Sequence, residues 1–573
     1  MSKVNITVDD QKIEVEEGST ILEASKEVGI DIPTLCYHPD LTLHGACRVC
    51  VVEDLNSDSL VASCVTPVRD GMEISTRSTR ARRARRRNVV LLLANHPNDC
   101  LGCDRNGTCE LQNIAHSLSI HTEDVEEIMG EQKELPLDDT GPALKRDPNK
   151  CILCGRCVRI CEEVQGVSAL QFSERGFDSI VTTAFNLPQS EINCANCGQC
   201  ATVCPVGAIT EISEIDKVWS ALEDDSKHVI VQTAPSIQAT IGEEFNMEAG
   251  SVVTGKLASA LRKMGFDRVF STEFSADLTI MEEGYEFLER LQSDKNLPHI
   301  TSCCPGWVKY AEHNYPDLLN HLSTAKSPQQ MFSAIAKTYY AEISGIDPET
   351  IYTVSIMPCT AKKFEKNRSE INSSGYKDTD AVLTTREIAR MIKEIGLQFN
   401  QLEEEEYDEL MGKATGAATI FGTTGGVAEA AVRTVKEKLN GEELERLNLG
   451  FRGVNEAEVE IKDRTIRVAI ANGLKNASRL LDEVRNGKSD YDFIEIMACP
   501  HGCVGGGGQP LPADNVKKDK RGKGLGSIDK AKFIRKSHDN PMIKKLYDEF
   551  LGEPAGEKAH KLLHTSYSNR EKN

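Results

Sequence analysis

The chain has 573 residues, of which 88 are acidic and 67 are basic, so its formal charge at pH 7 is −21. This length predicts about four structural units, and the acidic balance argues against a general nucleic-acid binder. The strongest apolar run, residues 89–94, is far shorter than the roughly 20 residues that cross a bilayer. Because the first residues also lack the pattern of a secretory signal, we expect a cytoplasmic protein that binds neither membrane nor nucleic acid.

Residues 1–80 predict a small α+β domain, with strands at 4–8 and 13–15 and a helix at 20–28 that Ser19 caps. The chain has twenty cysteines, and since the cytoplasm works against structural disulfides, metal ligation is their expected use. Four lie in this domain: Cys36, Cys47, Cys50 and Cys64. Their pattern resembles a plant-type 2Fe-2S ferredoxin, although ten residues separate the first two where four are usual.

A second unit is expected at residues 81–125. Seven arginines precede or begin it: Arg77, Arg80, Arg82, Arg83, Arg85, Arg86 and Arg87. They form either a solvated helix face or a patch for anions or a partner, and guanidinium groups near an anionic cluster would raise its potential. The next candidate ligands are His96, Cys100, Cys103 and Cys109. Three cysteines leave a 4Fe-4S cluster one ligand short, and because imidazole binds iron, we expect His96 to be the fourth.

Residues 140–215 contain two matched CxxCxxCxxxC runs, the pattern of bacterial two-cluster ferredoxins. In that pattern the fourth cysteine of each run binds the other cluster. One 4Fe-4S cluster would then take Cys151, Cys154, Cys157 and Cys204, and the other Cys194, Cys197, Cys200 and Cys161. Glu162 departs from the usual proline. Zinc is the alternative, but eight cysteines in two matched runs favour iron-sulfur clusters.

Residues 225–510 alternate β-rich and helical patterns, which predicts α/β layers. Strands are expected at 228–232, 353–357, 468–470 and 493–497, and helices at 327–340 and 385–395. Residues 511–573 carry 15 Lys/Arg against 9 Asp/Glu. We expect this basic tail to wrap the acidic body or a partner.

The remaining five cysteines lie in three segments, 301–307, 357–363 and 497–503. These segments resemble the three signature motifs of FeFe-hydrogenases, and the resemblance extends over nearly the whole chain. It implies a two-lobed α/β hydrogenase domain, completed by the basic tail, behind a β-grasp 2Fe-2S module, a His/Cys3 module and a two-4Fe-4S ferredoxin module. Ala361 and His501 stand where Ser and Gly are common, and we expect both to tune hydrogen bonding around the cofactor.

The resemblance also implies an H-cluster, which is a 4Fe-4S cubane joined to a di-iron unit with carbonyl, cyanide and dithiolate ligands. Its cubane ligands would be Cys304, Cys359, Cys499 and Cys503, with Cys503 as the bridge. Cys303 would exchange protons, as a thiol can. Glu283 and Glu286 lie on one face if their segment is helical, and with Ser323 they match the family's proton relay. Lys362 would donate to a cyanide. The implied pocket lining is Ala234, Pro235, Ser236, Gln329, Met357, Phe421 and Met497.

The implied function is reversible H2 oxidation and proton reduction. The chain would act either as a monomer with ferredoxin, or in an NAD(P)-linked, electron-bifurcating complex with flavin- and NAD(P)-binding subunits. Residues 96–116 and the tail favour the complex. The glycine run 505–508 lacks a phosphate-loop Lys-Ser/Thr, and close backbone packing is its expected role. The first 215 residues also resemble the large subunit of respiratory complex I, which has no counterpart to the last five cysteines. Retention of Cys303 and Lys362 disfavours a non-catalytic H2 sensor or iron-sulfur assembly protein.

Overall fold

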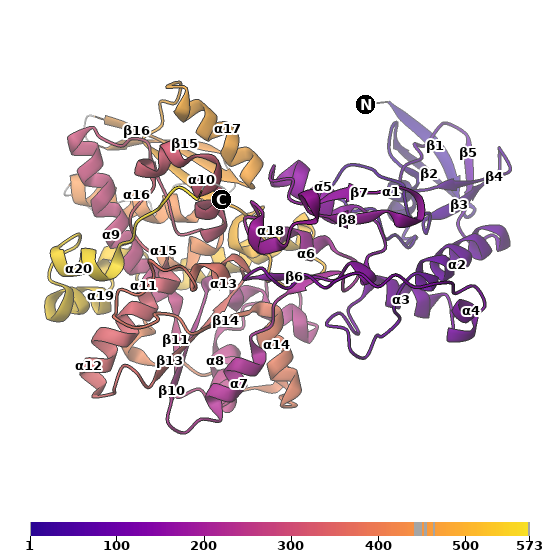
Figure 1. Ribbon diagram of the computed structural model, residues 1–573. Helices are drawn as coiled ribbons and strands as arrows, with labels where there is room; N and C mark the ends of the chain where they lie inside the picture. The colour runs from indigo at the N-terminus through magenta and orange to yellow at the C-terminus, as the bar shows by residue number, and fades with distance from the viewer. Residues whose placement is uncertain (1, 441–449, 452–454, 462–463, 571–573) are drawn as a thin grey trace.

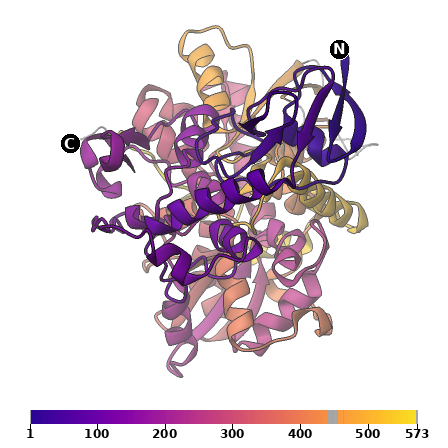
Figure 2. The same ribbon diagram turned by 90° about the vertical axis from the view of Figure 1, so that its right-hand side faces the viewer.

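The computed structural model describes residues 2–440, 450–451, 455–461 and 464–570. A large α/β body occupies one side, and the smaller N-terminal units project from it (Figure 1). Figure 2 shows these units in front of the body after a quarter turn. The N-terminal units and the body are therefore arranged in chain order.

The first unit is a five-stranded sheet in the order β2-β1-β5-β3-β4, with β1 parallel to β5. Its strands are β1 (Lys3–Val8), β2 (Gln11–Glu16), β3 (Val51–Asp54), β4 (Ser59–Ala62) and β5 (Met72–Ser75). Helix α1 (Ile21–Glu27) begins after Thr20, whose side chain accepts from the Glu23 N–H while the Glu23 carboxylate accepts from the Thr20 N–H. The helix is as predicted, but its cap is Thr20 and not Ser19, because only Thr20 has this reciprocal partner three residues later.

The second unit is built on α2 (Thr79–Ala94), which carries six of the seven arginines, with α3 (Glu110–Ser117) and α4 (Thr122–Glu126) against it. Arg85 is buried and donates to the Val51 carbonyl at 2.8 Å, and Arg86 pairs with Asp124 at 2.5 Å. The solvated-face interpretation is wrong at Arg85, which is buried against β3, whereas the Arg86 side chain stays 39% exposed while it pairs with α4.

The third unit consists of two short antiparallel ribbons and two short helices. The ribbons are β6 (Leu144–Arg146) with β9 (Ile209–Glu211), and β7 (Gln171–Ser173) with β8 (Ile180–Thr182). Each CxxCxxC run ends in one of the helices, α5 (Arg156–Arg159) or α6 (Gln199–Val203). Each run is thus a loop that turns into a helix, which lets three thiols converge.

The body contains two four-stranded sheets, and every predicted strand and helix within it is present. The first is parallel, with β11 (Arg268–Ser271), β10 (His228–Thr233), β13 (Ile351–Met357) and β14 (Ala381–Thr384) in that order. The second contains β12 (His299–Ile300), β17 (Phe493–Met497), β16 (Arg464–Asn472) and the antiparallel β15 (Glu456–Ile461). The carboxyl ends of β12, β13 and β17 lead into the three cysteine segments, and such strand ends are where α/β sheets form sites.

Helix α9 (Thr272–Ser293) packs against α11 (Pro328–Ile335) and α16 (Gly426–Asn440). The predicted helix at 327–340 is α11 followed by a π-turn, and the one at 385–395 is α14 (Thr385–Glu394). No helix in the described part of the chain is long and apolar enough to cross a membrane.

The basic tail forms α18 (Asn515–Ala531), α19 (Pro541–Leu546) and α20 (Glu557–Leu563), which pack on the body (Figure 1). Arg521 pairs with Glu243 at 2.6 Å, and Lys532 pairs with Glu273 at 2.6 Å. Of the two predicted roles, the structure therefore shows the tail wrapping the acidic body.

Candidate functional site

The four cysteines of the first unit gather in one place. The Sγ atoms of Cys50 and Cys64 are 3.3 Å apart, and the Cys36 thiol contacts those of Cys47 and Cys64. These contacts lower the pKa of Cys36, and the Cys64 hydrogen bond lowers the pKa of Cys50 to about 6. Four free thiols that share protons in this way fit a thiolate-ligated cluster.

His96 presents a free ring nitrogen inside the protein. Its Nδ1 accepts from the Asn98 N–H at 3.3 Å, whereas its buried Nε2 has no partner among the described residues. Burial lowers the pKa of His96, which favours the neutral ring that binds metals. Cys103 and Cys109 lie close enough to act on each other, Lys150 is near both Cys103 and His96, and Cys100 is exposed. The unpartnered, buried ring nitrogen is consistent with His96 as the predicted fourth ligand.

The third unit encloses two cavities, each with four cysteines. One is lined by Cys151, Cys154, Cys157 and Cys204, and the other by Cys161, Cys194, Cys197 and Cys200. The structure therefore brings together the two crossed sets that the spacing predicts. Within the described residues, no three His, Cys, Asp or Glu side chains form a group that could hold one metal ion.

The last five cysteines share one buried cavity between the two sheets of the body. Lys362 and all seven residues predicted as lining also face it. The residues concerned are Cys303, Cys304, Cys359, Cys499, Cys503, Lys362, Ala234, Pro235, Ser236, Gln329, Met357, Phe421 and Met497. Segments that lie up to 269 positions apart are joined here because the strand ends bring them to one point.

The electrostatics of this cavity suit a bound metal cluster. Burial raises the pKa of Cys359 to about 12 and raises those of Cys499 and Cys503 as well, so a nearby positive charge is needed to keep these thiols ionised. The Lys362 ammonium donates to the Cys303 carbonyl at 3.2 Å and to Glu365 at 3.0 Å. The Gln329 Oε1 has no partner among the described residues. The donor set thus fits a thiolate-bound cluster with an anionic ligand near Lys362.

The cavity is packed directly against the second CxxCxxC run. Thr360 donates to the Asn196 carbonyl at 2.7 Å, and the Gln199 amide donates to the Gly505 carbonyl at 2.9 Å. A Cβ on Gly507 would stand 2.3 Å from the Cys197 carbonyl oxygen, so only glycine fits. The expectation that the glycine run serves close backbone packing is confirmed.

Of the three predicted relay residues, Glu283 lies close enough to Cys303 to act on its thiol, and Glu286 and Ser323 are joined by a hydrogen bond. Glu283 is 1% exposed and neither of its oxygens has a hydrogen bond among the described residues. Burial and the negative charge of Glu283 raise the pKa of Cys303 well above its ordinary value. Glu286 accepts from Ser323 at 2.9 Å and from Arg290 at 2.6 Å. Burial raises the pKa of Glu286, but the neighbouring His299 and Arg290 and the Ser323 hydrogen bond outweigh it, and the net shift is downward.

Sequence reasoning missed two residues here. Arg290 lies four positions after Glu286 on the same helix, a spacing that could have revealed it. His299 is fully buried, with its Nε2 3.7 Å from the Glu283 Oε1. His299 lies on strand β12 and Glu283 on helix α9, so no local spacing in the sequence points to His299.

For His501 the expectation is wrong, because its side chain does not line the cavity. The Ala361 side chain does not line it either, but the Ala361 N–H donates to the Cys359 sulfur, a predicted cubane ligand. His501 has a φ of 62°, and its Nδ1 lies 3.1 Å from the Asp519 carboxylate, outside the cavity. A left-handed residue explains why glycine is common there. Ala361 is buried in the first turn of α13 (Ala361–Glu365).

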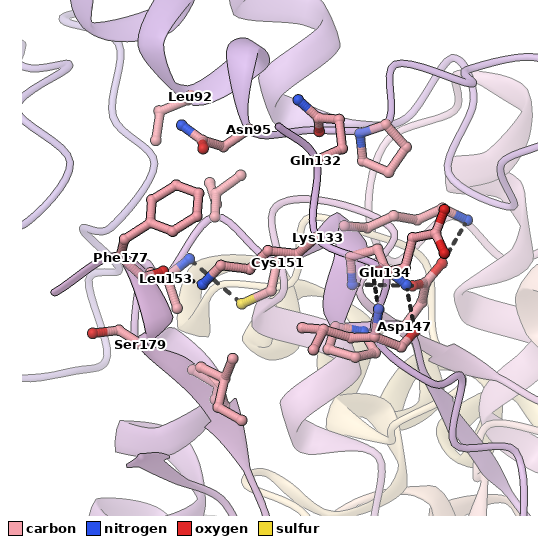
Figure 3. Close-up of a pocket in the computed structure, with 18 of the residues that line it drawn as sticks. Leu92, Asn95, Gln132, Lys133, Glu134, Asp147, Cys151, Leu153, Phe177 and Ser179 are labelled. Atoms are coloured by element: carbon pink, nitrogen blue, oxygen red, sulfur yellow. Dashed lines mark hydrogen bonds and ion pairs between the residues drawn. The ribbon is translucent and has the colours of Figure 1, made fainter. Parts of the chain in front are cut away.

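An open cavity of about 690 Å3 lies elsewhere, beside the first cavity of the third unit (Figure 3). Lys133, Glu134, Asp147 and Phe177 surround it, and the Cys151 sulfur at its floor accepts from the Leu153 N–H at 3.4 Å. It reaches a cluster site from the surface and does not touch the buried cavity of the body.

Comparison with family models divides the chain in the same order. Residues 1–79 match a 2Fe-2S iron-sulfur cluster binding domain, 85–124 the NADH-ubiquinone oxidoreductase-G iron-sulfur binding region, and 141–210 the ferredoxin-like domain of NADH-quinone oxidoreductase subunit 3. Residues 227–507 match the C-terminal domain of the iron only hydrogenase large subunit, and 515–570 the iron hydrogenase small subunit.

The chain is 47% identical to the NADP-reducing hydrogenase subunit HndD of Solidesulfovibrio fructosivorans, over 100% of both chains. It is 41% identical to iron hydrogenase 1 of Clostridium pasteurianum, over 98% of this chain and 99% of the relative. A solved FeFe-hydrogenase of Chlamydomonas reinhardtii is 42% identical with a TM-score of 0.56, covering 62% of this chain and 99% of that one. A bovine (Bos taurus) cytosolic iron-sulfur assembly component is 30% identical over 62% of this chain and 77% of its own.

Proposed function

The chain belongs to the family of iron-only hydrogenase large subunits and is the catalytic subunit of a hydrogenase, and we propose that it interconverts H2 with protons and electrons inside an NAD(P)-linked complex. One observation supports this most directly: five cysteines, Lys362 and the predicted lining meet at a single buried cavity that adjoins a ferredoxin-like unit. A protein that only transfers electrons would need the ferredoxin-like unit but not this cavity. The fold in finer terms would be a β-grasp first unit and a two-lobed catalytic domain.

We assign five clusters to the cysteine sets described above. The first unit would hold one 2Fe-2S cluster, and His96 with Cys100, Cys103 and Cys109 one 4Fe-4S cluster. The two cavities of the third unit would hold two more 4Fe-4S clusters. Cys304, Cys359, Cys499 and Cys503 would hold the cubane of an H-cluster, bridged through Cys503. When bound, that cofactor supplies the redox-active metal at which H2 is split or formed.

The protein's own residues would handle protons and exclude water. The Cys303 thiol gives its proton to Glu283, and Ser323 and Glu286 pass it toward Arg290 and the surface. Lys362 supplies a charge-assisted hydrogen bond to an anionic ligand. Met357, Met497 and Phe421 keep the cavity dry, which strengthens that bond.

Partner subunits would complete the enzyme. The chain has no recognisable phosphate-loop or dinucleotide motif, so flavin and NAD(P) would bind to other subunits, with ferredoxin as a further electron carrier and electron bifurcation as the overall scheme. The full-length likeness to a subunit named as part of an NADP-reducing hydrogenase supports the complex. A monomeric, ferredoxin-dependent enzyme is the second candidate, supported by the likeness to iron hydrogenase 1. Twenty free cysteines support a cytoplasmic location.

Infrared spectroscopy of anaerobically matured protein tests the proposal. Carbonyl and cyanide bands that shift under H2 are expected, and co-purification of a flavin-containing subunit distinguishes the complex from the monomer. Cys303→Ala is the matched control, because it should keep the bands and the iron but lose turnover. Absence of bands from a fully matured sample would contradict a catalytic role and leave an H2 sensor or an assembly protein.

A further inference from the structure

His299 is a buried histidine whose ring has no hydrogen bond in the described part of the structure. It lies between Phe287 and Phe493, with ring centroids 5.5 and 5.4 Å away, so its orientation is fixed by packing. Its Nε2 faces the Glu283 Oε1 at 3.7 Å. A buried polar group without a partner destabilises a fold, and such exceptions call for a functional explanation.

Few charged groups share this space. Helix α9 contributes Glu283, Glu286 and Arg290, of which the last two are paired with each other. Strand β17 contributes Glu495, whose carboxylate accepts from the Gly425 and Ala428 N–H groups at 2.7 and 2.8 Å.

Two further groups approach from neighbouring segments. Asp492 accepts the His299 backbone N–H through its carbonyl at 2.8 Å, and its side chain pairs with Arg464 at 2.6 Å. The His321 Nδ1 is hydrogen-bonded to the Pro298 carbonyl oxygen at 3.2 Å. The carboxyl of Glu283 is therefore the facing group that has no other described hydrogen-bond partner, and it is the one nearest to Cys303 in the proposed relay.

We propose that His299 is a positioning residue of the proton relay, which holds the Glu283 carboxyl toward Cys303. This inference rests on the proposed function. The neutral ring can donate its Nε2–H to the carboxylate or accept the proton of the carboxylic acid, after a small movement from 3.7 Å. The proton passes from the Cys303 thiol to Glu283 and onward, and the ring ends each cycle with the proton count it began with.

Two substitutions of similar length separate positioning from packing. His299→Gln keeps a hydrogen-bonding group, and His299→Met removes it. We expect His299→Gln to keep most of its turnover, because the amide can still bond the Glu283 carboxyl. His299→Met should lose turnover about tenfold or more, since a displaced acid or base transfers protons poorly. His321→Gln is the control, and its turnover should stay unchanged.

All rates are measured on the matured full chain and divided by the intensity of the cofactor's infrared bands. Equal losses of turnover in His299→Gln and His299→Met would overturn the proposal, because a packing role alone does not depend on a hydrogen-bonding group. If His299→Met does not fold, His299→Gln still decides, since a loss of about tenfold or more in that variant would also overturn the proposal. Missing bands in the unsubstituted protein would instead contradict the proposed function.

Discussion

Replacing Glu283 by glutamine should stop proton transfer and leave the fold intact. Neither carboxylate oxygen has a hydrogen bond among the described residues, so the amide loses no described contact and removes a buried charge. The glutamine cannot take the proton of Cys303. General acid–base groups contribute about 10²- to 10⁴-fold to a rate, so the barrier should rise by about 3 to 5 kcal/mol.

The adjacent Glu282 provides a matched control. It is equally buried, but its carboxylate accepts from the Tyr547 hydroxyl, from the Ala555 N–H at 2.9 Å and from His564 at 2.9 Å. Glutamine there turns one acceptor into a donor, which should destabilise the protein by about 1 to 3 kcal/mol. Glu282→Gln should therefore lower the melting temperature, and per folded molecule it should keep most of its rate.

The assay is H2 evolution from a reduced viologen, measured beside the melting temperature and the infrared bands of each matured variant. Glu283→Gln should have normal bands, a normal melting temperature and turnover reduced by at least about 10². Turnover within threefold of the unsubstituted protein would refute the assignment of Glu283. An equal loss of rate in Glu283→Gln and Glu282→Gln would show that the loss comes from changing a buried carboxylate and not from blocking proton transfer.

Three other predictions follow from the site. His96→Ala should change the EPR signal of one cluster and spare the rest, and an unchanged spectrum would point to another ligand. Gly507→Ala places a Cβ 2.3 Å from the Cys197 carbonyl oxygen, so the loops must separate. H2 evolution should drop several-fold, while H/D exchange should persist because it needs no outside electrons. Equal losses of H2 evolution and H/D exchange would contradict this prediction. Burial raises the pKa of Glu495 to about 7, so the folded state binds a proton that the unfolded chain releases. That stabilisation is complete below about pH 4 and is lost as the pH rises through 7. The melting temperature should fall from about pH 6 to about pH 8, and this fall should be smaller in Glu495→Gln.

Local spacing explains why so much of the site was predictable. The CxxCxxC runs form loops whose geometry depends on neighbouring residues, and the structure gathers the crossed sets around Cys161 and Cys204 as their spacing predicts. The strands that end at Met357 and Met497 also follow from short apolar runs.

Residues whose role depends on distant segments were not predictable. His299 becomes relevant only because β12 runs beside α9, and His501 loses its expected role because its ring turns to Asp519 in the tail. The Thr20 cap was missed for a smaller reason, since Ser19 and Thr20 are both good caps and only the bond to Glu23 decides between them.

The tail also has a consequence for the order in which the protein is made. Arg521 donates to the carbonyls of Val504 and Pro510 at 3.0 and 2.9 Å, so α18 fastens the last cysteine loop from outside. Every cavity cysteine is synthesised before this helix and before the His564 contact to Glu282. At about 5 to 20 residues per second, the roughly 60 residues after Pro510 take about 3 to 12 seconds to emerge. During that interval a nascent chain carries all its predicted ligands in a body that α18 does not yet fasten from outside.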